Sequence, residues 1–199
     1  MVDKEDYAEQ FVEAVERAIG EGDKSGEIGL HEPYFEDTDS MQYVEKCISS
    51  GWVSSSGIWI EKFEYELSKI TNAKHIISVV NGTVALRLAL HVVGVRANQE
   101  VILPAVSFIA TANAISHLKA IPHFVDIDKR TLGLSPKALK KRLEDIMEFR
   151  GGKPFNKETN REIGAIVPVH IFGNPCSIDE IVSVAEQLNI PVVEDAAQA

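Results

Sequence analysis

From residue 75 onward, short apolar runs alternate with stretches of helical spacing, and this alternation constrains the fold more than any other feature of the sequence. The apolar runs are almost entirely hydrophobic, so both faces of each predicted strand are expected to be buried. Strands of this kind occur in parallel sheets that helices cover on both sides. The sequence therefore predicts a three-layer α/β/α domain with a mostly parallel sheet.

The same patterns give approximate bounds for the elements of this domain. The predicted strands are Ile76–Val80, Val101–Leu103, Ile121–Val125, Ile163–Val169 and Ile190–Val193, and the predicted helices cover residues 83–93, 108–118, 136–149 and 177–188. Ser135-Pro136 favours a helix start, because proline at the first helical position loses no hydrogen bond. Ser177 and Glu180 have the spacing of a capping box. The polar residues 150–161 predict a surface excursion.

A helical amino-terminal segment precedes the α/β region. Apolar residues at helical spacing predict a helix over residues 4–19, and glycines then predict an irregular arm over residues 20–37. Two further helices are predicted, over residues 39–50 and from Trp59 to Ile70. We expect residues 1–37 to form a separate amino-terminal helix and arm.

Composition excludes several classes of protein. The chain has 199 residues, which suits one domain or slightly more, and a formal net charge of −10, which disfavours nonspecific nucleic-acid binding. No apolar run approaches the roughly 18 residues of a membrane helix. Cys47 and Cys176 are far apart and have no metal-binding spacing. We therefore expect a reduced, cytoplasmic protein with no metal, membrane or nucleic-acid partner.

Ligands of parallel α/β sheets bind at the carboxyl ends of the strands, and Asn81-Gly82-Thr83 stands at one such end. The first amides of the following helix could bind a phosphate. The tripeptide could equally be a tight turn in which Asn81 or Thr83 caps the helix. The sequence has neither the G-x-G-x-x-G of dinucleotide-binding folds nor the G-K-[ST] of a P-loop, which argues against nicotinamide cofactors and nucleoside triphosphatases.

Three other strand ends carry residues that could act chemically. Asp195, next to Glu194, could hold a metal ion, cap a turn or pair with a protonated ring nitrogen. Phe108 could offer a flat face to a planar ligand or belong to the core. His170 also ends a predicted strand, whereas the other histidines have the pattern of ordinary surface or core residues.

Taken together, six motifs in this order resemble the DegT/StrS-like sugar aminotransferases among the fold type I pyridoxal-phosphate enzymes. The motifs are Gly51–Gly57, Asn81–Leu86, Pro104–Thr111, Val125–Asp128, Pro168–Pro175 and Glu194–Ala199. The long amino-terminal arm and Thr131–Leu134 most resemble the legionaminic-acid and bacillosamine nucleotide-sugar branch. The resemblance implies that residues 38–199 form the first part of the large domain of such an enzyme.

The resemblance implies a pyridoxal 5′-phosphate site. Gly82 and the amides of Thr83 and Val84 would hold the cofactor phosphate. Phe108 would stack on the pyridine ring. Asp195 would pair with the ring nitrogen, and Gln198 would donate a hydrogen bond to the ring hydroxyl oxygen.

The implied reaction takes an amino group, by analogy from glutamate, to a keto group of a nucleotide-linked sugar in bacterial surface-glycan biosynthesis. The resemblance also implies a cytoplasmic homodimer. The lysine that such enzymes attach to the cofactor follows the Glu-Asp-Ala-Ala motif, and this sequence ends inside that motif at Ala199. We therefore assign no catalytic residue and expect about the first half of an enzyme, without the later strands and small domain, that is inactive alone.

Two alternatives remain open from the sequence. The chain could be a non-catalytic relative that binds the cofactor or a nucleotide-sugar as a regulator. It could also be a doubly wound domain with an unrelated phosphate ligand.

Overall fold

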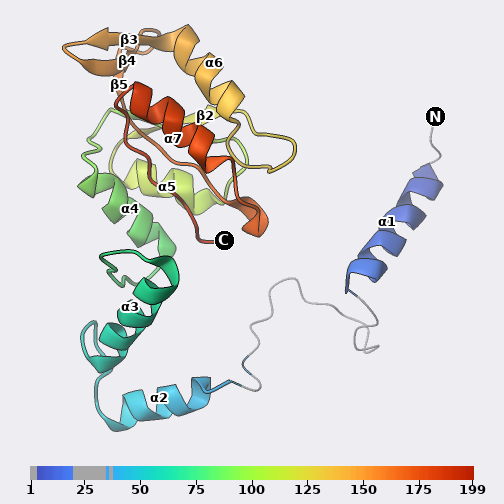
Figure 1. Cartoon of the computed structure of the whole chain (residues 1–199), viewed down its shortest axis with the longest axis vertical. Coiled ribbons are helices and arrows are strands. Elements are labelled where there is room, and N and C mark those ends of the chain that lie inside the picture. Colours follow the sequence, from blue (N-terminus) through green and yellow to red (C-terminus); the bar gives the residue numbers. More distant parts are fainter. Residues whose placement is uncertain (1–3, 20–34, 36–37) are drawn as a thin grey trace. The chain divides into compact units, whose positions relative to one another are not determined.

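The computed structural model describes residues 4–19, 35 and 38–199 (Figure 1). The chain divides into two compact units, residues 1–63 and 64–199. The first unit contains α1 (Lys4–Ile19), α2 (Ser40–Ser49) and the start of α3 (Ile58–Thr71). These helices match the three predicted before residue 75. The predicted arm at residues 20–37 lies, apart from residue 35, outside the described residues.

Aromatic side chains connect α2 to the start of α3. The rings of Tyr43 and Trp59 meet edge to face with their centroids 5.4 Å apart. The ammonium of Lys62 lies 5.0 Å from the Tyr43 ring centroid and 5.7 Å from that of Trp59. Such contacts stabilise the arrangement locally, although no residue of α2 is fully buried.

The second unit is built on a five-stranded sheet with the strand order β2-β1-β5-β4-β3. The strands are β1 (Glu100–Pro104), β2 (Ile121–Val125), β3 (Met147–Arg150), β4 (Lys153–Asn156) and β5 (Arg161–Ile166). β2, β1 and β5 are parallel, and β4 and β3 continue the sheet as antiparallel strands. The last predicted strand pairs with this sheet only through two isolated parallel bridges, Ile166 with Val192 and Val169 with Asp195.

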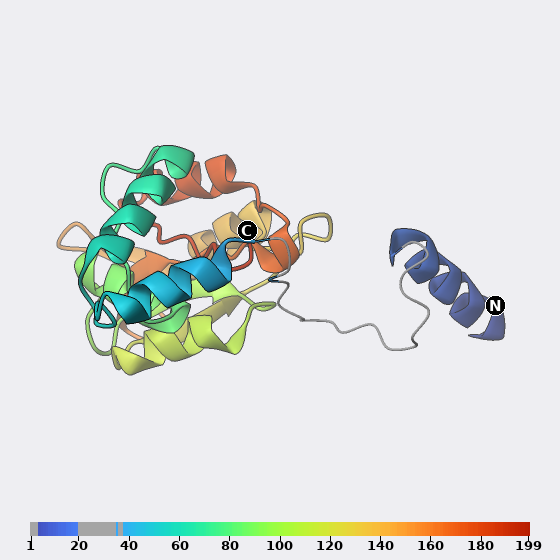
Figure 2. The same cartoon turned by 90° about the horizontal axis from the view of Figure 1, so that it is seen from below.

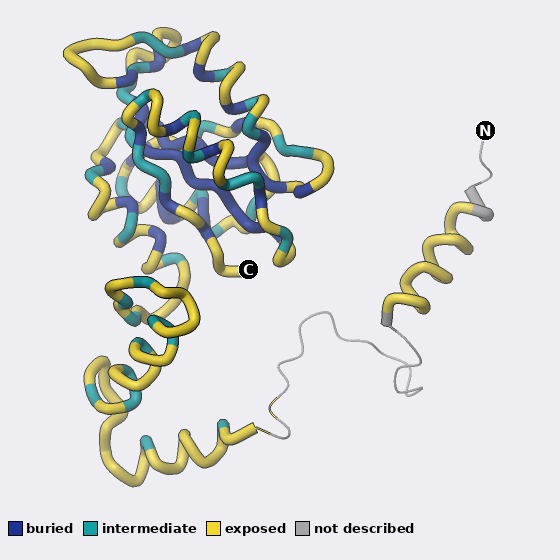
Figure 3. The backbone as a smooth tube through the Cα atoms, in the orientation of Figure 1, coloured by how far each residue is buried: buried dark blue, intermediate teal, exposed yellow. Residues whose placement is uncertain are grey.

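Helices pack on both faces of the sheet, as predicted (Figure 2). On one face, Val101 and Leu103 pack with side chains of α4 (Gly82–Val92) and α5 (Ile109–His117). On the other, Ile102 packs with α6 (Pro136–Ile146) and α7 (Ile178–Gln187). Successive β1 side chains point to opposite faces, so an all-apolar strand serves two cores. The buried residues concentrate in this sheet and its inner helix faces (Figure 3).

The predicted strand at Ile76–Val80 is wrong. Residues 75–79 have no regular secondary structure, and the side chains of Ile77 and Val80 are 73% and 83% exposed. A strand needs a neighbour for its backbone hydrogen bonds, and no described strand lies beside this segment. The amide of Ser78 donates instead to the Glu64 carboxylate, at 2.6 Å.

The predicted surface excursion at residues 150–161 is mostly exposed, but its first half is regular and belongs to a β-hairpin that the sequence pattern did not predict. Arg150 pairs with Lys153 across a two-residue loop, Gly151-Gly152, and both glycines have positive φ (58° and 82°). A type I′ hairpin turn requires positive φ at both loop positions, which glycine adopts without strain. Formation of β3 ends α6 at Ile146 rather than at the predicted residue 149.

The two predicted serine starts differ. Ser135 caps α6, because its hydroxyl accepts a hydrogen bond from the Ala138 amide at 3.2 Å, with Pro136 at the first helical turn. Ser177 precedes α7 but makes no side-chain cap hydrogen bond, so the predicted capping box with Glu180 is wrong. The backbone of Ser177 (φ −70°, ψ 71°) departs from the extended conformation in which a cap side chain reaches the first-turn amides.

Candidate functional site

The candidate site lies beyond the carboxyl end of β5, where the chain returns beside Val169 and reaches Asp195. Asp195 is 5% exposed. One carboxylate oxygen, Oδ2, accepts a hydrogen bond from the Thr111 hydroxyl at 2.6 Å, and the other, Oδ1, accepts one from the Ala197 amide at 3.2 Å. Among the described residues no cation pairs with this carboxylate. A buried negative charge is thus held by two neutral donors.

A cavity of about 240 Å³ joins Asp195 to the start of α4. Its lining residues are Gly82, Ala85, Leu86, Ala89, Val193, Glu194, Asp195, Ala196 and Ala197. A Cβ added to Gly82 would lie 3.9 Å from the Ala197 Cβ, so the helix start and the Asp195 segment are near neighbours. The structure therefore brings together Gly82 and Asp195, which are more than a hundred residues apart in sequence.

The start of α4 combines both interpretations of Asn81-Gly82-Thr83. Asn81 is the N-cap, and its Oδ1 accepts a hydrogen bond from the Val84 amide at 2.9 Å. The Val84 amide is therefore already used. The amides of Gly82 and Thr83 belong to the first turn, where no helical carbonyl is available to them, and they remain the candidates for binding an anion.

Phe108 stands at the N-cap position of α5, and its side chain is 61% exposed. Its carbonyl accepts a hydrogen bond from the Thr111 amide at 3.1 Å, while the Thr111 hydroxyl binds Asp195. A single turn of helix thus connects the exposed aromatic ring to the buried carboxylate. Phe108 is not part of the core, which leaves its ring face free for a planar ligand.

Gln198 holds the loop that follows β5. Its Oε1 accepts a hydrogen bond from the Phe172 amide at 2.9 Å, and a Cβ added to Gly173 would lie 3.1 Å from the Gln198 carbonyl oxygen. Phe172 has a left-handed backbone with φ 55°. Because Gln198 uses its oxygen as an acceptor, its amide nitrogen remains available as a donor.

His170 contacts Glu194 and Asp195 through its ring and its backbone. Its backbone amide donates to the Asp195 carbonyl at 3.1 Å. Its Nδ1 accepts from the Cys176 amide at 3.3 Å, which places the proton on Nε2, and Nε2 faces a Glu194 carboxylate oxygen at 3.0 Å. Burial raises the pKa of the Cys176 thiol, so this cysteine is a packed neighbour of the ring rather than a nucleophile.

Thr111 is the site residue to which sequence reasoning gave no role. It lies within the Pro104–Thr111 motif, but its partner Asp195 is 84 residues away. No local pattern reports such a contact. In the part of the chain that the structure describes, no group of three or more His, Cys, Asp or Glu side chains could hold a metal ion, and no helix is long and apolar enough to cross a membrane.

Comparisons with known proteins identify the family of this chain. Residues 35–199 match the family model described as the DegT/DnrJ/EryC1/StrS aminotransferase family. GDP-perosamine synthase from Escherichia coli O157:H7 is 39% identical over 158 residues, which cover 79% of this chain and 39% of that protein. The chain spans about two fifths of the length of the curated relatives it matches.

Two solved structures share the fold. 3-Amino-5-hydroxybenzoic acid synthase has a TM-score of 0.71 and 28% identity, covering 88% of this chain and 41% of that one. NtdA from Bacillus subtilis, solved with bound cofactor PMP, has a TM-score of 0.67 and 25% identity, covering 89% of this chain and 39% of that one. The family match takes in every residue of the candidate site, and the chain belongs to the DegT/DnrJ/EryC1/StrS aminotransferase family.

Proposed function

We propose that this chain carries the cofactor-binding part of a pyridoxal-phosphate-dependent enzyme that transfers an amino group to a keto group of a nucleotide-linked sugar. Family membership supports the reaction class. The name of a 39% identical relative, GDP-perosamine synthase, supports a nucleotide-linked sugar as the acceptor. The PMP bound to NtdA supports the cofactor. The legionaminic-acid and bacillosamine branch stays a prediction.

The observation that carries this proposal is the buried Asp195 carboxylate, which has no cation beside it among the described residues and borders the same cavity as Gly82. Burying a charge without a partner is costly. A protonated pyridine nitrogen would supply the missing positive charge, and a phosphate would suit the first-turn amides of α4. The residues present therefore fit the cofactor at both of its charged ends.

Each predicted residue has a role that its surroundings allow. The amides of Gly82 and Thr83 would hold the phosphate, whereas the Val84 amide would contribute only if Asn81 released it. Phe108 would stack on the ring from its exposed position. Gln198 would donate its amide hydrogen to the ring hydroxyl oxygen.

When bound, pyridoxal phosphate supplies an electron sink for the carbon that loses its proton. Asp195 would keep the ring nitrogen charged, and the apolar wall formed by Ala85, Leu86 and Ala89 would limit water access from one side. We propose glutamate as the amino donor by analogy with the family.

We also propose that the 199 residues alone do not transaminate. No residue that lines the cavity in the described part of the chain is a lysine, so no side chain there can attach to the cofactor and carry the proton. Positioned proton transfer alone contributes about 10²–10⁴-fold to a rate. Residues 1–199, supplied with pyridoxal phosphate and glutamate, should form no 2-oxoglutarate above the free-cofactor background.

A homodimer is part of the proposal, and exposed apolar side chains support it. Met41 and Ile48 of α2 are exposed, as are Trp52 and Val53 in the loop before α3. Apolar side chains gathered at a surface are typical of interaction sites. Sedimentation of the full-length protein should give a dimer, and a monomer at micromolar concentration would contradict this part of the proposal.

The test of the main function is spectroscopic and catalytic. The full-length protein should bind pyridoxal phosphate with a new absorbance band, glutamate should change that band, and 2-oxoglutarate should appear. Addition of a nucleotide-linked keto-sugar should then regenerate the first band and yield an amino-sugar. Cofactor binding without any response to glutamate would favour a non-catalytic regulator, and absence of cofactor binding would overturn the proposal.

A further inference from the structure

The contact between Thr111 and Asp195 has features beyond those needed for packing. Thr111 is 1% exposed, and its hydroxyl donates to Asp195 Oδ2 across 2.6 Å. Distances of about 2.5–2.7 Å are typical of hydroxyl donors to charged carboxylates. Threonine hydroxyls inside helices commonly return to a carbonyl of the preceding turn. This hydroxyl instead binds a carboxylate that is 84 residues away in sequence.

The place of Thr111 in α5 strengthens this interaction. Thr111 is the third residue of the helix, within the first turn, where unpaired amides create a partial positive charge. The Asp195 carboxylate therefore lies at the end of α5 that favours a negative charge. Both the hydroxyl and the helix end thus present positive partial charge to the Asp195 carboxylate.

The two donors leave Asp195 with free acceptor sites. A carboxylate can accept about four hydrogen bonds. Here Thr111 occupies a site on Oδ2 and the Ala197 amide one on Oδ1. The two neutral donors fix the plane of the carboxylate and neutralise none of its charge. Thr111 orients the carboxylate and leaves its other acceptor sites free for a ligand.

We infer that Thr111 is a positioning residue, which holds the Asp195 carboxylate in a fixed orientation for a cationic ring nitrogen. This inference rests on the proposed function. Without the hydroxyl, the carboxylate would be free to rotate, and only the correctly oriented fraction would bind the ring. Apparent affinity falls in proportion to the binding-competent fraction. Thr111 thus acts on the cofactor through Asp195 and touches neither substrate nor the reacting atoms.

The variants separate the hydroxyl from the methyl group. Thr111→Val keeps the shape and removes the donor, whereas Thr111→Ser keeps the donor and removes a methyl. Thr131→Val is the matched control, because Thr131 is also buried and its hydroxyl accepts a hydrogen bond only from the nearby Gly133 amide. If Thr111→Val does not fold, Thr111→Cys replaces it, since a thiol is a weak donor of similar size.

The measurement is the dissociation constant of pyridoxamine 5′-phosphate for the full-length protein, by fluorescence titration, with thermal unfolding as the folding check. Thr111→Val should weaken binding by about ten- to a hundredfold, the scale of one hydrogen bond to a charged group. Thr111→Ser should bind within a few-fold of wild type, and Thr131→Val should bind like wild type.

A deaza analogue of pyridoxamine phosphate, with carbon in place of the ring nitrogen, distinguishes positioning from general damage. If Thr111 acts on the nitrogen through Asp195, Thr111→Val and wild type should bind this analogue equally. An equal loss for both ligands would assign Thr111 a purely structural role, and unchanged binding of pyridoxamine phosphate would also overturn the inference. Failure of the wild-type protein to bind either ligand would overturn the proposed function itself.

Discussion

Two buried carboxylates lie at opposite ends of the central parallel strands, and their surroundings differ. Glu100 begins β1 at the amino edge and is 2% exposed, and Asp195 lies at the carboxyl edge with 5% exposed. Both would cost free energy if they were left without partners. Glu100 accepts hydrogen bonds from three side chains, whereas Asp195 accepts one from a side chain and one from a backbone amide.

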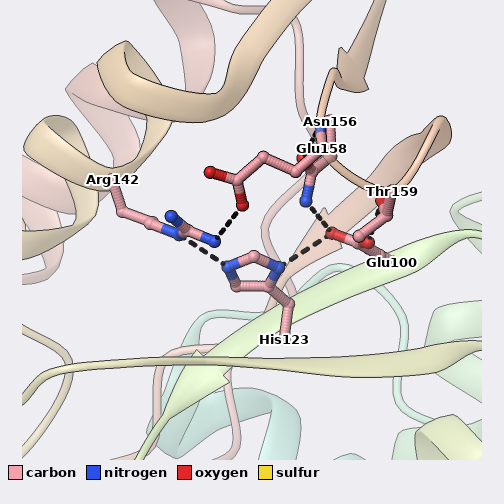
Figure 4. Close-up of polar contacts among 6 residues, drawn as sticks. All are labelled: Glu100, His123, Arg142, Asn156, Glu158 and Thr159. Carbon is pink, nitrogen blue, oxygen red and sulfur yellow. Dashed lines mark hydrogen bonds and ion pairs between the residues drawn. The ribbon is translucent and has the colours of Figure 1, made fainter.

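The Glu100 carboxylate receives hydrogen bonds from three side chains (Figure 4). The Thr159 hydroxyl donates to Oε1, and the Asn156 amide donates to Oε2 at 2.9 Å. His123 Nδ1 lies 2.8 Å from Oε2. These partners come from β2, β4 and the β4–β5 loop, so Glu100 fastens the hairpin to the parallel strands.

Arg142 of α6 completes this network. Its Nε donates to His123 Nε2 at 3.2 Å, and its guanidinium also pairs with Glu158 at 2.9 Å. Since arginine only donates, His123 Nε2 must be the acceptor, and its Nδ1 carries the proton toward Glu100. Burial raises the pKa of Glu100, but the hydrogen bonds from Thr159, Asn156 and His123 outweigh burial and hold that pKa below its usual range.

The Glu100 carboxylate serves stability, and the Asp195 carboxylate is placed to meet a ligand. A buried network whose donors are all paired rigidifies the fold. Asp195 has two neutral donors and borders a cavity, so its charge remains to be met by something outside the described residues. Substitutions at each end of the sheet test this distinction.

The largest expected effect is on stability, at the amino edge. Glu100→Ala leaves the buried Asn156 and the half-buried His123 without their acceptor, and each buried donor left unsatisfied costs about 1–3 kcal/mol, so a loss of about 2–6 kcal/mol is expected. Urea unfolding of the full-length protein should show a loss of that size. Glu162→Ala, which breaks the Lys153–Glu162 surface pair, is the control and should cost less than about 1 kcal/mol. Equal losses for the two variants would contradict the distinction.

The second effect is on function, at the carboxyl edge. Asp195→Asn keeps the shape of the side chain and removes the charge. The activation free energy should therefore rise by several kcal/mol, and each increment of about 1.4 kcal/mol lowers the turnover rate tenfold. The free energy of unfolding should stay within about 1 kcal/mol of wild type, because an uncompensated buried charge has been removed. The same denaturation and turnover assays serve here. A variant that unfolds readily yet retains turnover would reverse the roles given to the two carboxylates.

The third effect is acid sensitivity. The ionised form of Glu100 is favoured in the folded state, so its contribution is complete above the ordinary glutamate pKa of about 4.3 and is lost as pH falls below it. The loss should be smaller than for Glu100→Ala, because a protonated carboxyl group still fills its place. The midpoint temperature of thermal unfolding should therefore fall more steeply between pH 5 and pH 3 in wild type than in Glu100→Gln. Parallel curves would show that Glu100 contributes nothing to the acid response.

Local sequence patterns predicted those parts of the molecule that local physics determines. The helices and the three central parallel strands follow from apolar periodicity, and the α6 start follows from Ser135-Pro136. The hairpin has a local signal, Gly151-Gly152, but the polar residues around it favoured the prediction of a loop. The strand expected at Ile76–Val80 has the right composition but no neighbour, and strand composition cannot supply one.

Contacts between distant residues could not be predicted in the same way. The family resemblance named Asp195, but nothing in the sequence indicated that Thr111 binds it. The partners of Glu100 come from β2, β4 and the β4–β5 loop and have no common sequence pattern. The packing of whole elements determines which buried polar groups meet, so these contacts cannot be predicted from local sequence.

The smallest effect compares three helix starts. Asn81 and Ser135 both cap their helices through the side chain, whereas Ser177 does not. Asn81→Ala and Ser135→Ala should each lower the free energy of unfolding by about 1 kcal/mol, the usual value of an N-cap, and Ser177→Ala should change it little. Denaturant unfolding of the three variants measures this order.

Only one of these caps borders the candidate site, and this makes the series informative beyond stability. In wild type the Val84 amide donates to Asn81 Oδ1. Asn81→Ala releases this amide and adds it to the first-turn amides that a phosphate beside Gly82 could bind. Asn81→Ala should therefore keep or increase the affinity for pyridoxamine 5′-phosphate, despite its lower stability. Ser135→Ala loses the same stability at a remote helix and should leave that affinity unchanged. Asn81→Asp should weaken phosphate binding, because it keeps the cap and places a negative charge at the helix start. If all three substitutions left affinity unaltered, the phosphate would not bind at the start of α4, and the cavity would have to serve a different end of the ligand.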